Sequence, residues 1–156
     1  MPTTNQEQLY TFDLVNGQPN VQLIMFNTED PSWVGLKYPN GDMFTGFVQQ
    51  FTYLQDPTIS NRSFSPFVGH FLNGILHSLT EPAFIIKRNT GRIKATHWLK
   101  HGKNHREDGA AYYAPDGRCA YYLDGIELSL AAYYERQKNT IHAEKIMALI
   151  LSSRTQ

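Results

Sequence analysis

The heptapeptide Leu99-Lys-His-Gly-Lys-Asn-His105 occurs three times in related form, and this repetition decides the expected fold. Phe71-Leu-Asn-Gly-Ile-Leu-His77 lies 28 residues before it, and Tyr122-Leu-Asp-Gly-Ile-Glu-Leu128 lies 23 residues after it. In each copy a glycine turn separates two short strands. A hairpin of this length cannot bury its apolar face alone, so neighbouring copies must stack on one another. The repeat therefore predicts an array of stacked β-hairpins.

The other glycines give the same indication. Of eleven glycines, three follow Asn and three follow Asp, and these dipeptides supply the positive φ angles of tight hairpin turns. Five strand pairs are expected: 9–15 with 21–26, 33–38 with 43–53, 67–72 with 75–79, 84–87 with 93–99, and 112–114 with 118–123. The expected fold class is mainly β, an antiparallel β-meander with one C-terminal α-helix.

The pattern changes after Leu128, where the helix is expected. The Ser129 hydroxyl can accept from the free amides of a first helical turn, and no Gly or Pro interrupts residues 130–151. A kink is expected at Asn139-Thr140, because both residues are poor helix formers. The end from Ile146 to Leu151 is apolar around most of its circumference, so we expect it to be buried on the sheet or in a homodimer.

The chain thus divides into a flexible tail (1–8), a β-hairpin domain (9–128) and a C-terminal helix (129–156). Its 156 residues, 41% hydrophobic, suit one folded domain. Fourteen basic residues balance fourteen acidic ones, which argues against a general nucleic-acid binder. No run approaches the ~20 apolar residues of a membrane span. A single cysteine and an N-terminus without a secretory pattern predict a cytoplasmic protein.

The stretch Trp98-Leu-Lys-His-Gly-Lys-Asn-His-Arg-Glu-Asp-Gly-Ala-Ala111 resembles the W-x-x-x-G-x-x-H-R-E-D-G-P-A repeat of small MORN-like proteins, which are frequent in tailed phages. The resemblance covers residues 67–135 well and 33–48 loosely, and it departs from the family at Ala110, where the family has Pro. It implies a scaffold of MORN-like hairpins with an interaction role, and it carries no catalytic motif. For phage members it also implies a role directed at the host, such as anti-defence.

Charge is unevenly distributed along the chain. Residues 1–60 hold six acidic residues and one lysine, whereas residues 61–156 hold thirteen basic and eight acidic residues. Seven basic residues and no acidic one lie between Lys87 and Arg106. Strand alternation would place Lys94, Trp98 and Lys100 on one face, and cations around an aromatic ring suit a nucleotide or an acidic protein surface. The candidate binding residues are Arg92, Lys94, Trp98, Lys100, His101, Lys103, His105 and Arg106. Alternatively, this basic face docks on the acidic N-terminal half.

Three histidines, His97, His101 and His105, are spaced by four residues. With Glu107 or Asp108 they could complete a zinc site. The alternative is that His105 and Asp108 cap a repeat turn by hydrogen bonding to the backbone, and we expect neither a metal nor a cofactor. P-loop, nucleophile-elbow, dinucleotide and zincin motifs are missing from the sequence, so no catalytic residue is assigned.

The expected function is that of a non-catalytic binding protein, a phage-encoded inhibitor or adaptor that acts on a host protein through the 87–106 hairpin. One alternative is a sponge that sequesters a small anionic nucleotide signal at Trp98. A second alternative is a phosphodiester-cleaving enzyme that uses His97, His101 and His105. The expected partners are therefore a host protein or a nucleotide-like ligand, with no membrane, and a homodimer can form through the C-terminal helix.

Overall fold

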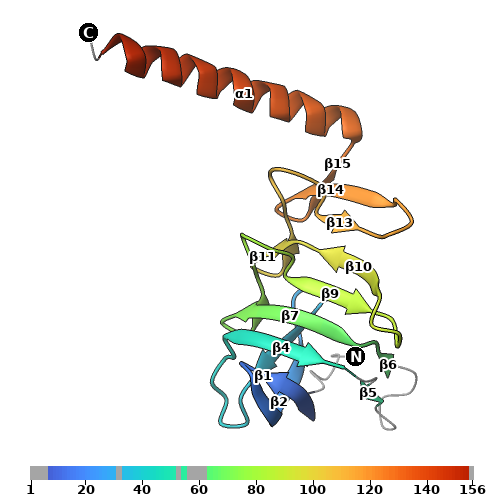
Figure 1. The fold of residues 1–156 in the computed structure, drawn as a ribbon. Coiled ribbons are helices and arrows are strands. Elements are labelled where there is room, and N and C mark those ends of the chain that lie inside the picture. The colour runs from blue at the N-terminus through green and yellow to red at the C-terminus, as the bar shows by residue number, and fades with distance from the viewer. Residues whose placement is uncertain (1–6, 31–32, 52–53, 56–62, 155–156) are drawn as a thin grey trace, which may run out of the picture.

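The computed structural model describes residues 7–30, 33–51, 54–55 and 63–154 (Figure 1). An antiparallel sheet of eleven strands follows the order β15-β14-β13-β10-β9-β7-β4-β1-β2-β3, with β8 paired to β7. Its strands are β1 (Gln8–Val15), β2 (Gln18–Asn27), β3 (Val34–Lys37), β4 (Gly46–Gln50), β7 (Phe67–Leu72), β8 (Ile75–Leu76), β9 (Phe84–Lys87), β10 (Ile93–His97), β13 (Tyr112–Tyr113), β14 (Cys119–Leu123) and β15 (Ile126–Leu128). The mainly β fold class is confirmed.

Two small hairpins and one helix complete the described part of the chain. The hairpins are β5 (Leu54–Gln55) with β6 (Ser63–Phe64), and β11 (Leu99–Lys100) with β12 (Lys103–Asn104). The helix is α1 (Leu130–Ser153). Residues 1–6 of the expected N-terminal tail lie outside the described residues, and strand β1 begins at Gln8.

The three repeated hairpins form where the sequence predicts them. Each turn has two consecutive residues with positive φ, which is the geometry of a type I′ turn. These turn residues are Asn73 (50°) and Gly74 (82°), His101 (49°) and Gly102 (77°), and Asp124 (49°) and Gly125 (82°). The expected pairing of 9–15 with 21–26 is also confirmed, as are 84–87 with 93–97 and 112–113 with 119–120.

The turn of each repeated hairpin donates a hydrogen bond to an earlier part of the chain, which is Thr45 for the first copy and the preceding repeated hairpin for the second and third. The bonds of this series, which we name the turn ladder, are Asn73 N to Thr45 Oγ1 (2.9 Å), His101 N to His77 Nδ1 (2.9 Å) and Asp124 N to His105 Nδ1 (3.0 Å). Backbone bonds run beside them, from Gly102 N to Leu76 O (2.8 Å) and from Gly125 N to Asn104 O (2.9 Å). The repeat histidine therefore accepts a backbone hydrogen bond through Nδ1. The backbone-capping alternative is confirmed for His105, whereas Asp108 Oδ1 accepts from Arg106 Nε at 2.9 Å.

The expected hairpin between 33–38 and 43–53 forms only at its turn, where Tyr38 N donates to Asp42 O (2.8 Å) and Phe44 N donates to Leu36 O (3.1 Å), beside an isolated bridge from Lys37 to Met43. Beyond the turn the expected pairing is wrong, because β3 pairs with β2 and β4 lies between β1 and β7. The first four strands thus have the spatial order 4-1-2-3 of a Greek key. The reason is non-local packing, because Phe44 and Val48 become fully buried beside Phe12 in this arrangement. A turn residue pattern alone does not specify such contacts.

The sheet curls at this end, so that β3 approaches β8. Leu36 N donates to Gly74 O at 2.9 Å, and Gly74 N donates to Phe44 O at 2.7 Å. The large buried side chains lie inside the curl. Toward β13–β15, in contrast, the buried side chains are small, such as those of Ala95, Ala111 and Ala114. The main core therefore lies at the Greek-key end of the molecule.

Helix α1 begins as expected, since Ser129 Oγ accepts from Ala132 N at 3.1 Å. The helix continues unbroken through Asn139-Thr140, so the expected kink is absent. No described residue of α1 is buried, and the helix projects away from the sheet (Figure 1). Both alternatives, packing of α1 on the sheet and a homodimer, therefore stay predictions.

Candidate functional site

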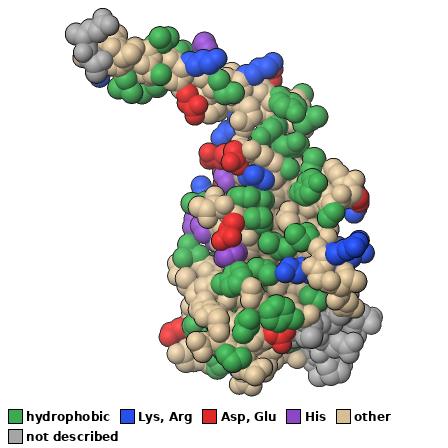
Figure 2. Space-filling view, viewed as in Figure 1, with side chains coloured by type: hydrophobic (Ala, Val, Ile, Leu, Met, Phe, Trp, Pro, Cys, Tyr) green, Lys and Arg blue, Asp and Glu red, His purple; other side chains and the backbone are tan. Residues whose placement is uncertain are grey.

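A groove lined by four basic residues lies at one edge of the sheet. It has a volume of about 800 Å³, and we name it the basic groove. Its lining residues are Arg88, Thr90, Arg92, Ile93, Lys94, Ala114, Pro115, Asp116 and Arg118. Figure 2 shows Lys and Arg side chains gathered on this edge of the molecule. Of the eight predicted binding residues, Arg92 and Lys94 lie here.

Two neighbouring hairpin turns build the basic groove. One joins β9 to β10, where Arg88 N donates to Arg92 O at 2.8 Å. The other joins β13 to β14, where Ala114 N donates to Arg118 O at 2.9 Å. Strand β10 pairs with β13, so the two turns stand side by side. Sequence analysis missed Arg118, because only the β10–β13 pairing brings it next to Arg92.

The cations of the basic groove differ in how far they are neutralised. Arg118 Nε donates to Asp116 Oδ2 at 2.7 Å. The pKa of Asp116 is lowered, chiefly because its carboxylate accepts from the Arg118 backbone amide. Arg88, Arg92 and Lys94 are exposed and form no ion pair among the described residues. The groove therefore presents uncompensated positive charge to solvent.

The alternative in which the basic segment docks on the acidic N-terminal half finds no ion pair in the described part of the chain. Lys37, which belongs to the N-terminal half itself, pairs with Glu7 there. Arg106 pairs with Asp108 at 2.9 Å, two residues away. No ion pair joins residues 87–106 to an acid before residue 60 in the described ranges.

Trp98 and Arg106 form a separate contact outside the basic groove. The Arg106 guanidinium lies 4.0 Å from the centre of the Trp98 ring, and its Nη1 donates to Ala110 O at 3.3 Å. One face of the indole is therefore covered by an internal cation. The expected face shared by Lys94, Trp98 and Lys100 does not form, because strand β10 ends at His97 and Lys100 belongs to hairpin β11–β12.

The remaining predicted residues, Lys100, His101, Lys103 and His105, lie in or beside the β11–β12 hairpin. The exposed His101 ring lies 4.4 Å from the ring of His77. His105 is buried in the turn ladder, with its Nδ1 3.1 Å from Asp124 Oδ1. His97 instead lies against the core, its ring 4.7 Å from that of Trp33. In the described ranges no three His, Cys, Asp or Glu side chains meet in a cluster that could hold a metal ion.

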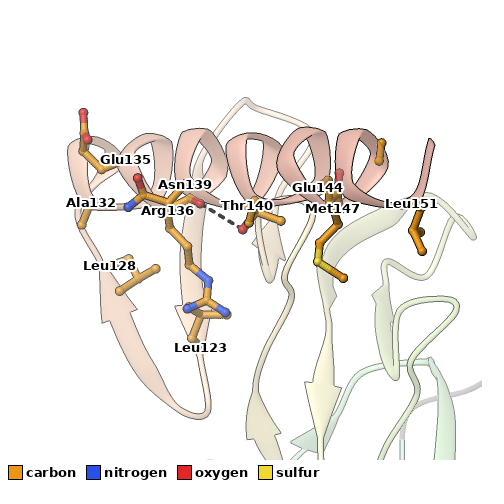
Figure 3. Close-up of a pocket in the computed structure, with 12 residues that line it drawn as sticks. Leu123, Leu128, Ala132, Glu135, Arg136, Asn139, Thr140, Glu144, Met147 and Leu151 are labelled. Atoms are coloured by element: carbon orange, nitrogen blue, oxygen red, sulfur yellow. Dashed lines mark hydrogen bonds between the residues drawn. The ribbon is translucent and has the colours of Figure 1, made fainter. Parts of the chain in front are cut away.

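A second surface lies under helix α1. A hollow of about 1110 Å³ opens between the helix and the end of the sheet, and its walls include Leu123 and Leu128 of the strands and Ala132, Met147 and Leu151 of the helix (Figure 3). Contact between helix and sheet is confined to the first turns, where the Tyr133 ring stacks 4.2 Å from Tyr121. The apolar helix end expected to be buried is exposed in the isolated chain.

The chain matches no protein-family model, no curated protein and no solved structure. The resemblance to MORN-like repeats therefore stays a prediction. The helix of the described chain is not long and apolar enough to span a membrane. Function has to be argued from the geometry of the basic groove and its surroundings.

Proposed function

We propose that the chain is a non-catalytic binding protein that receives an acidic surface of a protein partner in the basic groove. The observation that carries this proposal is a set of exposed cations that have no ionic partner among the described residues, Arg88, Arg92 and Lys94, beside Arg118. Arginine matches a carboxylate with two parallel hydrogen bonds. The apolar side chains of Ile93 and Pro115 in the same groove suit the aliphatic parts of a protein surface.

A protein partner is favoured over a nucleotide by the composition of the groove. No aromatic side chain lines it, so a base would have no ring on which to stack. Trp98, the residue expected to supply that ring, is outside the groove and already in contact with Arg106. Phosphate groups could still bind the arginines, so the sponge alternative is one outcome of the test below.

The phage origin and the host-directed role are proposals that rest on the MORN-like resemblance alone. The phosphodiesterase alternative required His97, His101 and His105 to converge, and the three rings have different neighbours: Trp33 and Tyr112 for His97, His77 for His101, and Asp124 for His105. We therefore propose no catalytic role for them.

Isothermal titration calorimetry with an eight-residue poly-glutamate peptide tests the proposal, with ATP as the nucleotide probe. The double variant Arg88→Glu/Arg92→Glu is expected to weaken peptide binding at least about tenfold. The control Lys138→Glu/Lys145→Glu changes the net charge equally on exposed positions of α1 and should leave the affinity unchanged. The proposal also predicts a loss of affinity between 50 and 200 mM salt, because the contacts are exposed.

Three outcomes would contradict the proposal. Equal weakening by both double variants would show a general charge effect without a site. ATP binding much tighter than peptide binding, abolished by Arg88→Glu/Arg92→Glu, would establish the nucleotide alternative. No binding of the peptide at millimolar concentration would remove the groove as an acidic-surface site.

A further inference from the structure

A cavity of about 320 Å³ lies beside the core, between strands β2 and β3 on one side and β7, β9 and β10 on the other. It is distinct from the basic groove, with which it shares no lining residue. Val34 and Ile86 contribute to opposite walls, and Phe67 and Phe84 add aromatic rings. Protein interiors rarely leave a void much larger than a water molecule. A space of this size beside a packed core therefore calls for an explanation.

The size and the walls of the cavity suit a small aromatic molecule. Ligand pockets begin at roughly 300 Å³ and are mostly apolar, and an apolar cavity of roughly 150 Å³ accepts benzene. The present volume is about twice that value, which corresponds to two fused rings. The Phe67 and Phe84 ring centroids lie 5.2 Å apart and that of Trp33 lies 5.9 Å from Phe84. An inserted ring would thus find several aromatic neighbours.

One polar atom of the cavity walls, Trp33 Nε1, is buried and has no hydrogen-bond partner among the described residues. Trp33 as a whole is only 9% exposed, and its ring lies 4.7 Å from that of His97. A buried polar atom without a partner destabilises the folded state. Such atoms are rare in native proteins, so this one requires an explanation.

The charge state of the walls indicates that the ligand is neutral. Burial lowers the pKa of His97 to about 4, and a side-chain hydrogen bond with Asn104 opposes this lowering. At neutral pH the imidazole is therefore uncharged. Apart from His97 and Trp33, every residue that lines the cavity is apolar. A charged ligand would therefore lose its hydration without compensation.

We propose that this cavity binds a small, uncharged, bicyclic aromatic molecule that carries a hydrogen-bond acceptor for the Trp33 indole N–H. The acceptor is a ring nitrogen or a carbonyl oxygen. This inference is independent of the acidic-surface proposal, because it involves other residues and another class of ligand. A single protein could hold both ligands at once.

Titration of the full chain with quinoline and naphthalene tests the proposal. Both molecules have two fused rings, but only quinoline has a ring nitrogen that can accept the indole N–H. Quinoline is expected to bind at least about fivefold more tightly, the factor that corresponds to a typical net hydrogen bond. In ¹⁵N-resolved NMR spectra, quinoline should shift the Trp33 indole N–H signal and naphthalene should shift it much less. The Trp98→Phe variant keeps only the Trp33 indole N–H signal, so its spectrum assigns the two signals of the wild-type protein.

Two matched variants of strand β9 separate the cavity from the surrounding sheet. Ile86→Phe places a larger side chain in the cavity and should weaken quinoline binding at least about tenfold, with an unchanged or raised Tm. Ile85→Phe points to the other face of the same strand and should keep the affinity. Should Ile86→Phe fail to fold, Val34→Phe fills the cavity from the opposite wall.

The proposal is overturned if neither probe binds saturably below about 1 mM, a free energy near −4 kcal/mol. Equal binding of quinoline to the wild-type protein and to a folded cavity-filling variant would also overturn it. Equal affinity for the two probes, without a shift of the Trp33 indole signal, would remove the assigned role of Trp33.

Discussion

Acid is expected to destabilise the fold through His97. The pKa of the imidazole is about 4 in the folded chain, because burial disfavours its charged form, against 6.5 for an ordinary histidine. As the pH falls below 6.5, His97 becomes protonated in the unfolded chain while it stays unprotonated in the folded chain. The free energy of unfolding therefore decreases between about pH 6.5 and pH 4, and this contribution changes no further below pH 4.

The magnitude follows from the difference between the two pKa values. Each pKa unit corresponds to about 1.4 kcal/mol, so the full contribution of His97 is about 3 kcal/mol. Part of the ring is reached by water, which reduces the effect. We expect a loss of about 2 kcal/mol between pH 7.5 and pH 4.5. This is a large share of the roughly 5–15 kcal/mol that stabilises an ordinary domain.

Urea denaturation followed by tryptophan fluorescence at both pH values measures this loss. The variant His97→Phe keeps an aromatic ring against Trp33 and Tyr112 but cannot titrate, so its loss between the two pH values should be smaller by about 2 kcal/mol. His77, whose pKa is lowered by burial and then by His101 and Lys100, contributes equally to both proteins. His142→Phe, on the exposed face of α1, is the control. Equal losses in the wild-type protein and in His97→Phe would refute the reasoning.

Three further predictions concern the repeats and the helix. Gly102→Ala should lower the Tm measured by calorimetry more than Gly117→Ala does. Both glycines have positive φ, but a Cβ at Gly102 would lie 2.6 Å from Ile75 Cγ2, whereas a Cβ at Gly117 would have no atom within 4 Å. Equal shifts in Tm would contradict this prediction. His105→Ala should cost about 1–3 kcal/mol in urea denaturation, because it removes an acceptor of the turn ladder, and His105→Asn should recover part of that loss. Deletion of residues 138–156 should change Tm by less than about 2 °C, since α1 has no buried residue; a larger decrease would mean that the helix packs against the domain or a second copy.

The local parts of the fold could be predicted from the sequence because short-range chemistry determines them. Asn-Gly and Asp-Gly turns require neighbouring strands to pair, and Ser129 sets the helix start. The position of β4 could not be predicted, because it depends on the burial of Phe44 and Val48 against strands that are distant in sequence. The exposure of α1 was also missed, since an apolar composition indicates burial without naming the surface that covers it.

The candidate site divides in the same way. Arg92 and Lys94 could be predicted from the density of positive charge in one hairpin, whereas Arg118 joins them only through the pairing of β10 with β13. The spacing of His97, His101 and His105 suggested that their side chains meet, but strand β10 ends at His97 and the three side chains lie in different surroundings. The aromatic cavity could not be predicted, because its walls come from six strands (β2, β3, β7, β8, β9 and β10) that span residues 25–97.

The turn ladder makes the hairpin stack a spacer of adjustable length. Every bond is donated by the turn of a repeated hairpin and accepted by a side chain that lies earlier in the sequence, so the stack has a direction. It also has an end, because Leu128 stands in the last copy at the position of His77 and His105 and has no side-chain acceptor. Adjacent strands are about 4.8 Å apart, so one inserted hairpin would carry α1 about 10 Å further from the Greek-key core. The number of copies thus fixes the reach of the helix independently of the cavity.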